Sequence, residues 1–244
     1  MEITGYDLDA APEPDRGEDD WDFRSGVWDF TFLLRRDTLL TGQGFDRWAE
    51  GYDASVDRSD AEGSYPFAGY QRVQDAIVRR VLAKGRPVVL DIGFGTGVLT
   101  ERLYQAGCEV YGQDFSSEMI AIARGKMPGA KLCQGDFARG LAAELTERDY
   151  DFILATYSLH HLTDPEKVRF LTELRARLRP GGTILIGDVA FKTRTALEAC
   201  RLAAGEDWDG EEAYFVVEEL RKDFPDLCFV PMSPCAGVLS LENE

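Results

Sequence analysis

The sequence predicts an α/β protein in which helices cover both faces of a doubly wound, parallel sheet and an antiparallel hairpin ends the chain. Two observations predict it. Short β-branched runs alternate with segments of helical periodicity, which is the pattern of a parallel sheet with crossover helices. Near the end, "LCFVPM" and "AGVLSL" are separated only by "SPC", and so short a connection favours a hairpin.

The first half of the chain holds the regular alternation. A helix is expected over 73–85, where apolar residues recur at helical spacing. "PVVLDIG" predicts a buried strand, and "EVYGQD" and "AKLCQGD" predict the next two. Helices over 98–107 and 116–125 are expected between these strands. A short helix over 141–145 precedes a fourth strand, "YDFILAT".

The second half continues the pattern. Thr163 or Asp164 is expected to cap a helix with Pro165 in its first turn, because these residue types are favoured at those positions. "RPGG" is expected to turn into a fifth strand, "TILIGDV". The acidic segment "GEDWDGEEAYFVVEELRKDF" places Phe215 and Leu220 on one side and predicts an amphipathic helix.

The composition limits which binding partners and which cellular location are expected. The net charge is −17, and a protein that binds nucleic acid or an anionic membrane surface needs a surplus of Lys and Arg, so neither is expected. No apolar run is long enough for a membrane span, and the acidic start lacks the pattern of a secretory signal. Five cysteines without metal-ligand spacing fit a cytoplasmic location. Cys228 and Cys235 could face each other across the hairpin, although free thiols are the default.

Acidic residues and glycines gather at the predicted strand ends, where ligands of such sheets bind. The first three strands end at Asp91, Asp114 and Asp136. An acid in the position of Asp114 accepts hydrogen bonds from a ribose diol, and Asp136 is placed to accept from an adenine amine. A glycine-rich loop follows the first strand, and its glycines are Gly93, Gly95 and Gly97.

The spacing of these glycines separates two cofactor classes. An NAD-type oxidoreductase uses G-x-G-x-x-G, whereas "DIGFGTG" has G-x-G-x-G and the acid Asp91 just before it. A pyrophosphate gains nothing from a neighbouring carboxylate, but a ligand with an ammonium and a sulfonium does. A non-catalytic cofactor-binding or interaction module stays open as a further alternative, because such residues report binding and not turnover.

Several motifs stand in order along the chain: "VVLDIGFGTGVLTERL", "VYGQDFSSEMIAIAR", "CQGDFARG", "YDFILATYSLHHLTD" and "LRPGGTILIGDV". They resemble the motifs of class I S-adenosylmethionine-dependent methyltransferases (EC 2.1.1.-), nearest to the small bacterial quinone-biosynthesis group, over about 45–189. The resemblance implies a Rossmann-like, seven-stranded sheet with an antiparallel last strand and a helical N-terminal cap containing "FDRWAEGYD". It also implies in-line methyl transfer from S-adenosylmethionine, with S-adenosylhomocysteine as product.

The resemblance further implies roles for the candidate cofactor residues. The three glycines shape the loop under the methionine part, and Asp91 acts on the methionine end through water. Asp114 holds the ribose hydroxyls, and Phe115 lies against the adenine. Asp136 meets the adenine amine, with the backbone of Phe137 beside it.

On the acceptor side, the resemblance implies that Thr156 lines the pocket near the methyl group and that Tyr52 closes over the cofactor. Tyr70 and Tyr157 are candidate substrate residues. The string after the fourth strand, "ATYS", is neither the D/N-P-P-Y/F motif of amino-methylating DNA and glutamine enzymes nor a Pro-Cys nucleophile. A small-molecule acceptor is therefore expected.

His160 and His161 are the only histidines and follow the fourth strand. One is expected to pack structurally, while the other faces the acceptor as a base or hydrogen-bond donor. A metal site is not expected, since adjacent side chains point apart and no Cys or carboxylate completes a ligand spacing.

The domain organisation combines these expectations. Residues 1–44 form an acidic, aromatic and partly disordered extension that packs on the domain, forms a homodimer contact or lies around the substrate. The methyltransferase domain spans 45–244. Its parts are cap helices over 45–85, the cofactor-binding core over 86–189, lid or insert helices over 190–225 and the terminal hairpin over 226–244.

Overall fold

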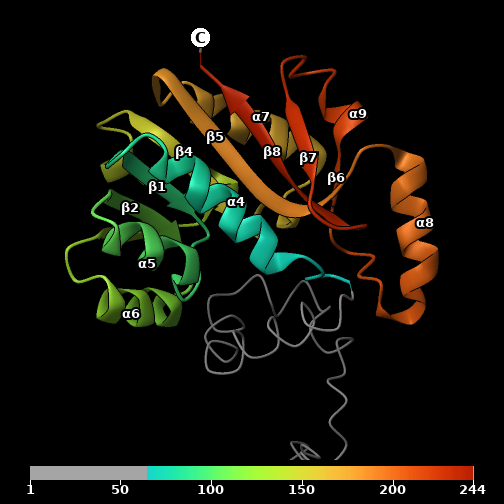
Figure 1. The fold of residues 1–244 in the computed structure, drawn as a ribbon, viewed down its shortest axis with the longest axis horizontal. Helices are drawn as coiled ribbons and strands as arrows, with labels where there is room; N and C mark the ends of the chain where they lie inside the picture. The colour runs from blue at the N-terminus through green and yellow to red at the C-terminus, as the bar shows by residue number, and fades with distance from the viewer. Residues whose placement is uncertain (1–64, 244) are drawn as a thin grey trace, which may run out of the picture. The chain divides into compact units, whose positions relative to one another are not determined.

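The computed structural model describes residues 65–243, in which one mixed sheet runs in the order β3-β2-β1-β4-β5-β8-β7 (Figure 1). The neighbours from β3 to β5 pair in parallel, whereas β8 pairs antiparallel with β5 and β7. This order confirms the doubly wound sheet and the terminal hairpin, and a short strand, β6, adds to it beside β5. The strands are β1 (Val88–Ile92), β2 (Glu109–Asp114), β3 (Lys131–Gln134), β4 (Tyr150–Thr156), β5 (Leu178–Phe191), β6 (Phe215–Val216), β7 (Cys228–Pro231) and β8 (Ala236–Glu242).

Helices cover both faces of the sheet, as predicted: α4 crosses the near face in Figure 1 and α7 lies behind it. Side chains cap the starts of two helices, and the cap at Thr163 was predicted. Ser116 accepts a hydrogen bond from the Met119 N–H at the start of α6, and Thr163 and Glu166 form a capping box before α7. The helices are α4 (Tyr70–Leu82), α5 (Val98–Gln105), α6 (Ser117–Lys126), α7 (Asp164–Arg175), α8 (Arg194–Ala204) and α9 (Val217–Leu220).

The alternation of side chains along each strand builds a core on both faces. In β4, Phe152 and Leu154 pack in the cluster that contains α4 and α5, whereas Ile153 and Ala155 pack in the cluster that contains α7 and α9. Because both faces of the central strands are buried, β1 and β4 are largely apolar runs rather than alternating ones. This explains why the strand predictions held.

Two expected elements differ from the structure. "RPGG" is not a turn before the strand but part of β5, because Gly181 and Gly182 exchange backbone hydrogen bonds with Asn243 beyond β8. The predicted helix of the acidic segment is limited to Val217–Leu220. Phe215–Val216 instead form β6 and pair with the end of β5, so tertiary pairing outweighs the helical periodicity there.

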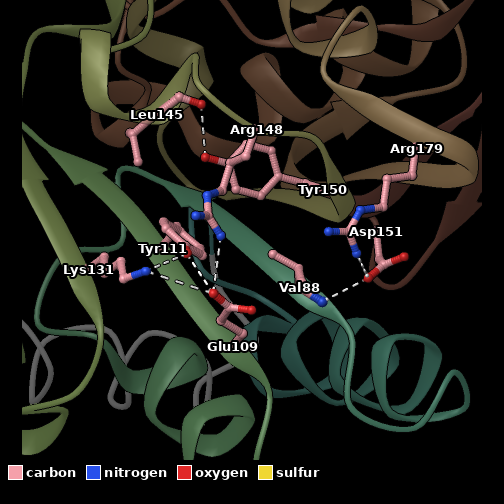
Figure 2. A network of polar contacts seen from close by, with 9 residues as sticks. All are labelled: Val88, Glu109, Tyr111, Lys131, Leu145, Arg148, Tyr150, Asp151 and Arg179. Carbon is pink, nitrogen blue, oxygen red and sulfur yellow. Dashed lines mark hydrogen bonds and ion pairs between the residues drawn. The ribbon is translucent and has the colours of Figure 1, made fainter.

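A polar network holds the amino ends of the strands (Figure 2). The Asp151 carboxylate accepts from the Val88 N–H at 2.8 Å and from Arg179 at 2.9 Å, which joins β1, β4 and β5. Glu109 accepts from the Tyr111 hydroxyl at 2.6 Å and from Arg148 at 3.1 Å. Hydrogen bonds and ion pairs within the protein therefore stabilise this edge of the sheet.

Several expectations fall on residues 1–64, which lie outside the described residues: the N-terminal extension, its homodimer contact, Tyr52 and the cap segment before Tyr65. All five cysteines are free thiols, and Cys228 lies opposite Ser240 in the hairpin rather than opposite Cys235. None of the described helices is both long and apolar enough to span a bilayer.

Candidate active site

The carboxyl ends of β1 and β2 bring Asp91, the glycine loop and Asp114 together. The two carboxylate oxygens of Asp114 accept from the Gly95 N–H at 2.8 Å and from the Ser116 N–H at 2.9 Å. Asp114 therefore fixes the loop after β1 to the loop after β2. Its negative charge also acts on Asp91.

Asp91 is a buried carboxylate, and only one of its two oxygens has a hydrogen-bond partner among the described residues. The Thr100 hydroxyl donates to Oδ2 at 2.5 Å, but Oδ1 is buried and has no hydrogen-bond partner among the described residues. Burial raises the pKa of Asp91 to about 7, with the charge of Asp114 adding and the Thr100 hydrogen bond opposing. An unsatisfied buried acceptor is costly, so this position favours a ligand that supplies a donor or a positive charge.

The glycines of the loop serve two different purposes. Gly93, Gly95 and Gly97 all have positive φ, at 68°, 57° and 83°. A Cβ on Gly93 would lie 2.5 Å from the Cβ of Ser158, so this glycine allows close packing against the loop after β4. A Cβ on Gly95 would meet nothing within 4 Å. The backbone at Gly95 therefore borders open space, as a cradle for a ligand does.

The loop after β3 holds the candidates for adenine contact. Asp136 accepts from the Ala138 N–H at 3.0 Å and pairs with Arg139 Nε at 3.2 Å, so its carboxylate has local partners. Phe137 stacks on Phe170 with ring centroids 6.1 Å apart, and its ring edge lies near Gly93. Phe115 is half-buried beyond β2.

The acceptor side begins at the end of β4. Thr156 is the last residue of that strand, and the next residue, Tyr157, is buried with φ 49°. Such a φ is rare for a bulky residue and marks a conformation that the surroundings enforce. The Tyr157 ring lies 5.1 Å from Tyr70 and 5.4 Å from Phe67, between ring centroids. The structure thus brings the two predicted substrate residues together.

Further aromatic residues from the predicted cap and lid segments, none of them a predicted site residue, extend this group. Trp208 lies with ring centroids 5.0 Å from both Tyr65 and Tyr214, and the Tyr65 and Tyr214 hydroxyls are hydrogen-bonded to each other. All pack in one hydrophobic cluster with Tyr157. The sequence signal that could have indicated these residues was the concentration of aromatic side chains in an acidic insert. We call the following set the aromatic cluster: Tyr65, Phe67, Tyr70, Tyr157, Trp208 and Tyr214.

The two histidines face each other and two acids. Their ring centroids are 4.4 Å apart, so the expectation that the adjacent side chains point apart is wrong. His160 Nδ1 lies 2.7 Å from the buried Asp188 of β5, and His161 Nδ1 lies 3.0 Å from Glu212. Burial lowers the pKa of His160, but the charge and hydrogen bond of Asp188 raise it more, to about 9. The role of either histidine as a base stays a prediction.

Known proteins are similar to this chain in sequence and in fold. A family model described as a methyltransferase domain matches residues 89–182. An uncharacterized methyltransferase of Geobacillus kaustophilus (strain HTA426) is 39% identical over 178 residues, covering 70% of this chain and 80% of that protein. One of Anoxybacillus flavithermus (strain DSM 21510 / WK1) is 38% identical over 155 residues, covering 64% and 70%. The chain belongs to the class I S-adenosylmethionine-dependent methyltransferases.

Solved structures agree with the fold of this methyltransferase. Magnesium protoporphyrin IX methyltransferase from Synechocystis PCC 6803 with bound S-adenosylhomocysteine matches with a TM-score of 0.61 at 22% identity, over 88% of this chain and 100% of that one. The DhpI-SAM-HEP complex matches with a TM-score of 0.61 at 20% identity, over 83% and 97%. The predicted Rossmann-like fold is confirmed, and methyl transfer from S-adenosylmethionine displaces the oxidoreductase and non-catalytic alternatives.

Proposed function

We propose that this methyltransferase modifies a small molecule held between the cofactor and the aromatic cluster. The observation that carries the proposal is the meeting of Tyr70 and Tyr157 at the carboxyl end of β4, beside the glycine loop. Aromatic side chains bury a large apolar area of a small ligand, and Tyr hydroxyls add polar contacts. A net charge of −17 supports a small acceptor over nucleic acid.

For the cofactor, three features support the predicted site. The orphaned Asp91 Oδ1 fits the ammonium of the methionine part, and the open space at Gly95 fits close approach of the ligand to the backbone. Both oxygens of Asp114 accept backbone N–H groups, which fixes the carboxylate at the strand end where a ribose diol would donate to it. When bound, the cofactor supplies an electrophilic methyl group on a sulfonium.

We propose the remaining cofactor roles for residues after β2, after β3 and at the end of β4. Phe137, whose ring edge lies near Gly93, would contact the adenine together with Phe115. Asp136 would accept from the adenine amine beside its present bonds to Ala138 and Arg139. Thr156, as the last residue of β4, would line the pocket near the methyl group.

The chain contributes to the reaction chiefly by alignment, because the sulfonium already carries a strong leaving group. Orientation is worth up to roughly 7–11 kcal/mol in ideal intramolecular cases. Tyr157, held by its N–H to Gly187 at 2.8 Å and by its unusual φ, is a rigid wall of the acceptor space. The aromatic cluster excludes water from the line between acceptor and methyl carbon.

The parts of the domain fit the same proposal. Residues from α4 and from the 190–225 insert, such as Tyr70 and Tyr214, belong to one hydrophobic cluster. This supports an insert that encloses the acceptor. Five free thiols support a reducing, cytoplasmic location.

Isothermal titration with S-adenosylhomocysteine tests the cofactor site. Asp114→Ala should weaken binding by about a hundredfold, since hydrogen bonds to a charged group contribute roughly 1.5–3 kcal/mol each. Glu118→Ala, which removes an exposed acid on the following helix, is the matched control and should bind normally. Equal affinity of Asp114→Ala and the control would refute the ribose role.

A further inference from the structure

We propose that His160, His161 and Glu212 bind one divalent transition-metal ion, of which Zn²⁺ is the representative, on the acceptor side of the pocket. The ligand atoms of these three residues lie within 4.8 Å of one another. In a tetrahedral Zn²⁺ site with bonds of about 2.0–2.2 Å, the donor atoms lie about 3.3–3.6 Å apart. Side-chain rotations that bring the three ligand atoms roughly 1 Å closer would therefore complete the site.

The ligands come from two segments that tertiary structure joins. The Ala213 N–H donates to the His160 carbonyl at 3.0 Å, which fixes the insert beside the 3₁₀ turn that carries both histidines (Leu159–His161). His161 Nδ1 lies 3.0 and 3.1 Å from the two Glu212 oxygens. A metal ion would take the place of the proton between these atoms.

Asp188 orients His160, which is the third ligand of the proposed site. Its Oδ1 accepts from His160 Nδ1 at 2.7 Å and from the Val189 N–H at 2.8 Å, and the residue is fully buried. This hydrogen bond leaves Nε2 as the ring nitrogen that binds a cation. A carboxylate on the far nitrogen is the usual support of a metal-bound imidazole, which it holds in one orientation and makes more basic.

The charge around the cluster is matched by a divalent cation. Lys167 is buried beside it, where its ammonium pairs with Asp164 at 3.0 Å and donates to the Ala213 carbonyl. The ion would displace the imidazole protons, and Asp164, Asp188 and Glu212 would then carry three negative charges against one positive charge on Lys167. One divalent ion would neutralise the remaining two negative charges. Two of the three ligands are imidazole nitrogens, which favour a transition-metal ion over Mg²⁺ and Ca²⁺, because those two ions prefer oxygen ligands.

Three protein ligands leave a coordination position open, as in catalytic zinc sites. Building on the proposed function, that position would bind the thiol or hydroxyl of the acceptor and lower its pKa. The acceptor loses its proton to solvent, and its heteroatom forms a bond to the methyl carbon. The carbon–sulfur bond breaks with its electrons on sulfur, which leaves S-adenosylhomocysteine.

Titration of the chelator-treated full chain with Co²⁺ and Zn²⁺ tests this site. We expect one equivalent of Co²⁺ to give visible d–d absorption without a thiolate charge-transfer band, which excludes binding by the cysteines. Zn²⁺ should displace it, and Mg²⁺ should not. Asp188→Asn should weaken Zn²⁺ by about 10–100-fold, and His161→Ala and Glu212→Gln by more.

Glu211→Gln is the matched control, because Glu211 is exposed beside Glu212 and should leave metal affinity unchanged. S-adenosylhomocysteine affinity, measured on each variant, reports folding and the cofactor site separately. Failure of wild type to bind Co²⁺, or binding that Glu212→Gln and His161→Ala leave intact, overturns the metal site. Failure to bind S-adenosylhomocysteine would instead overturn the proposed cofactor site.

Discussion

Asp91 gives the sharpest quantitative prediction, because its ionisation should control cofactor affinity near neutral pH. The pKa of this buried carboxyl is raised to about 7 in the ligand-free protein. A methionine ammonium beside Oδ1 would keep it ionised, so binding requires loss of the proton. S-adenosylhomocysteine should therefore bind more weakly as the pH falls through 7, and Asp91→Asn should remove this dependence.

The size of the effect follows from the pKa. At pH 6 about one molecule in eleven has an ionised Asp91, whereas at pH 8 about ten in eleven do, if the pKa is about 7. The dissociation constant should then rise about tenfold from pH 8 to pH 6, which corresponds to about 1.4 kcal/mol. Asp91→Asn should bind weakly and equally at both values.

Calorimetry at matched ionic strength measures both proteins across this range. The difference between wild type and Asp91→Asn isolates Asp91 from other groups that titrate there, such as the ligand's own amine. A wild-type affinity that does not change between pH 6 and pH 8 would refute the reasoning. So would an Asp91→Asn variant that keeps the wild-type slope.

Further substitutions test other parts of the structure. Gly95→Ala should abolish S-adenosylhomocysteine binding but cost only about 1–2 kcal/mol of stability by denaturant unfolding, because the Cβ enters open space at positive φ. Gly93→Ala should destabilise more, since its Cβ would meet Ser158 at 2.5 Å, and equal losses would contradict this contrast. The pKa of Asp91 is higher in the folded than in the unfolded protein, so folding is less favourable at a pH where this carboxyl is ionised. From pH 5 to pH 8, the free energy of unfolding of the ligand-free wild type should fall by up to about 3 kcal/mol relative to that of Asp91→Asn. An equal pH dependence of the two unfolding free energies would refute this. Asp151→Ala should cost about 1–3 kcal/mol by leaving the Val88 N–H unpaired, with cofactor affinity unchanged.

Features set by local sequence could be predicted. The strands β1 and β4 are largely apolar runs bounded by turn residues, and the cap at Thr163 depends on residues within one helical turn. Asp91 and Asp114 were found because parallel strands end at the same edge of a sheet. For the same reason, the glycine loop beside them was assigned correctly to that edge.

Features set by distant contacts could not be predicted. Glu212 reaches His161 only because Ala213 pairs with His160, and no spacing in the sequence reports that contact. Asp188 looked like an ordinary strand residue until β5 placed it beside His160. The periodicity of the acidic segment predicts a helix, but Phe215 pairs with β5 instead.

The central claim is that the edge formed by Asp91, Gly95 and Asp114 binds S-adenosylmethionine. Calorimetric titration of the purified full chain with S-adenosylmethionine, S-adenosylhomocysteine and NAD tests it most directly. Both sulfur ligands should bind one to one, and NAD should not bind. Binding of NAD without either sulfur ligand would contradict the account.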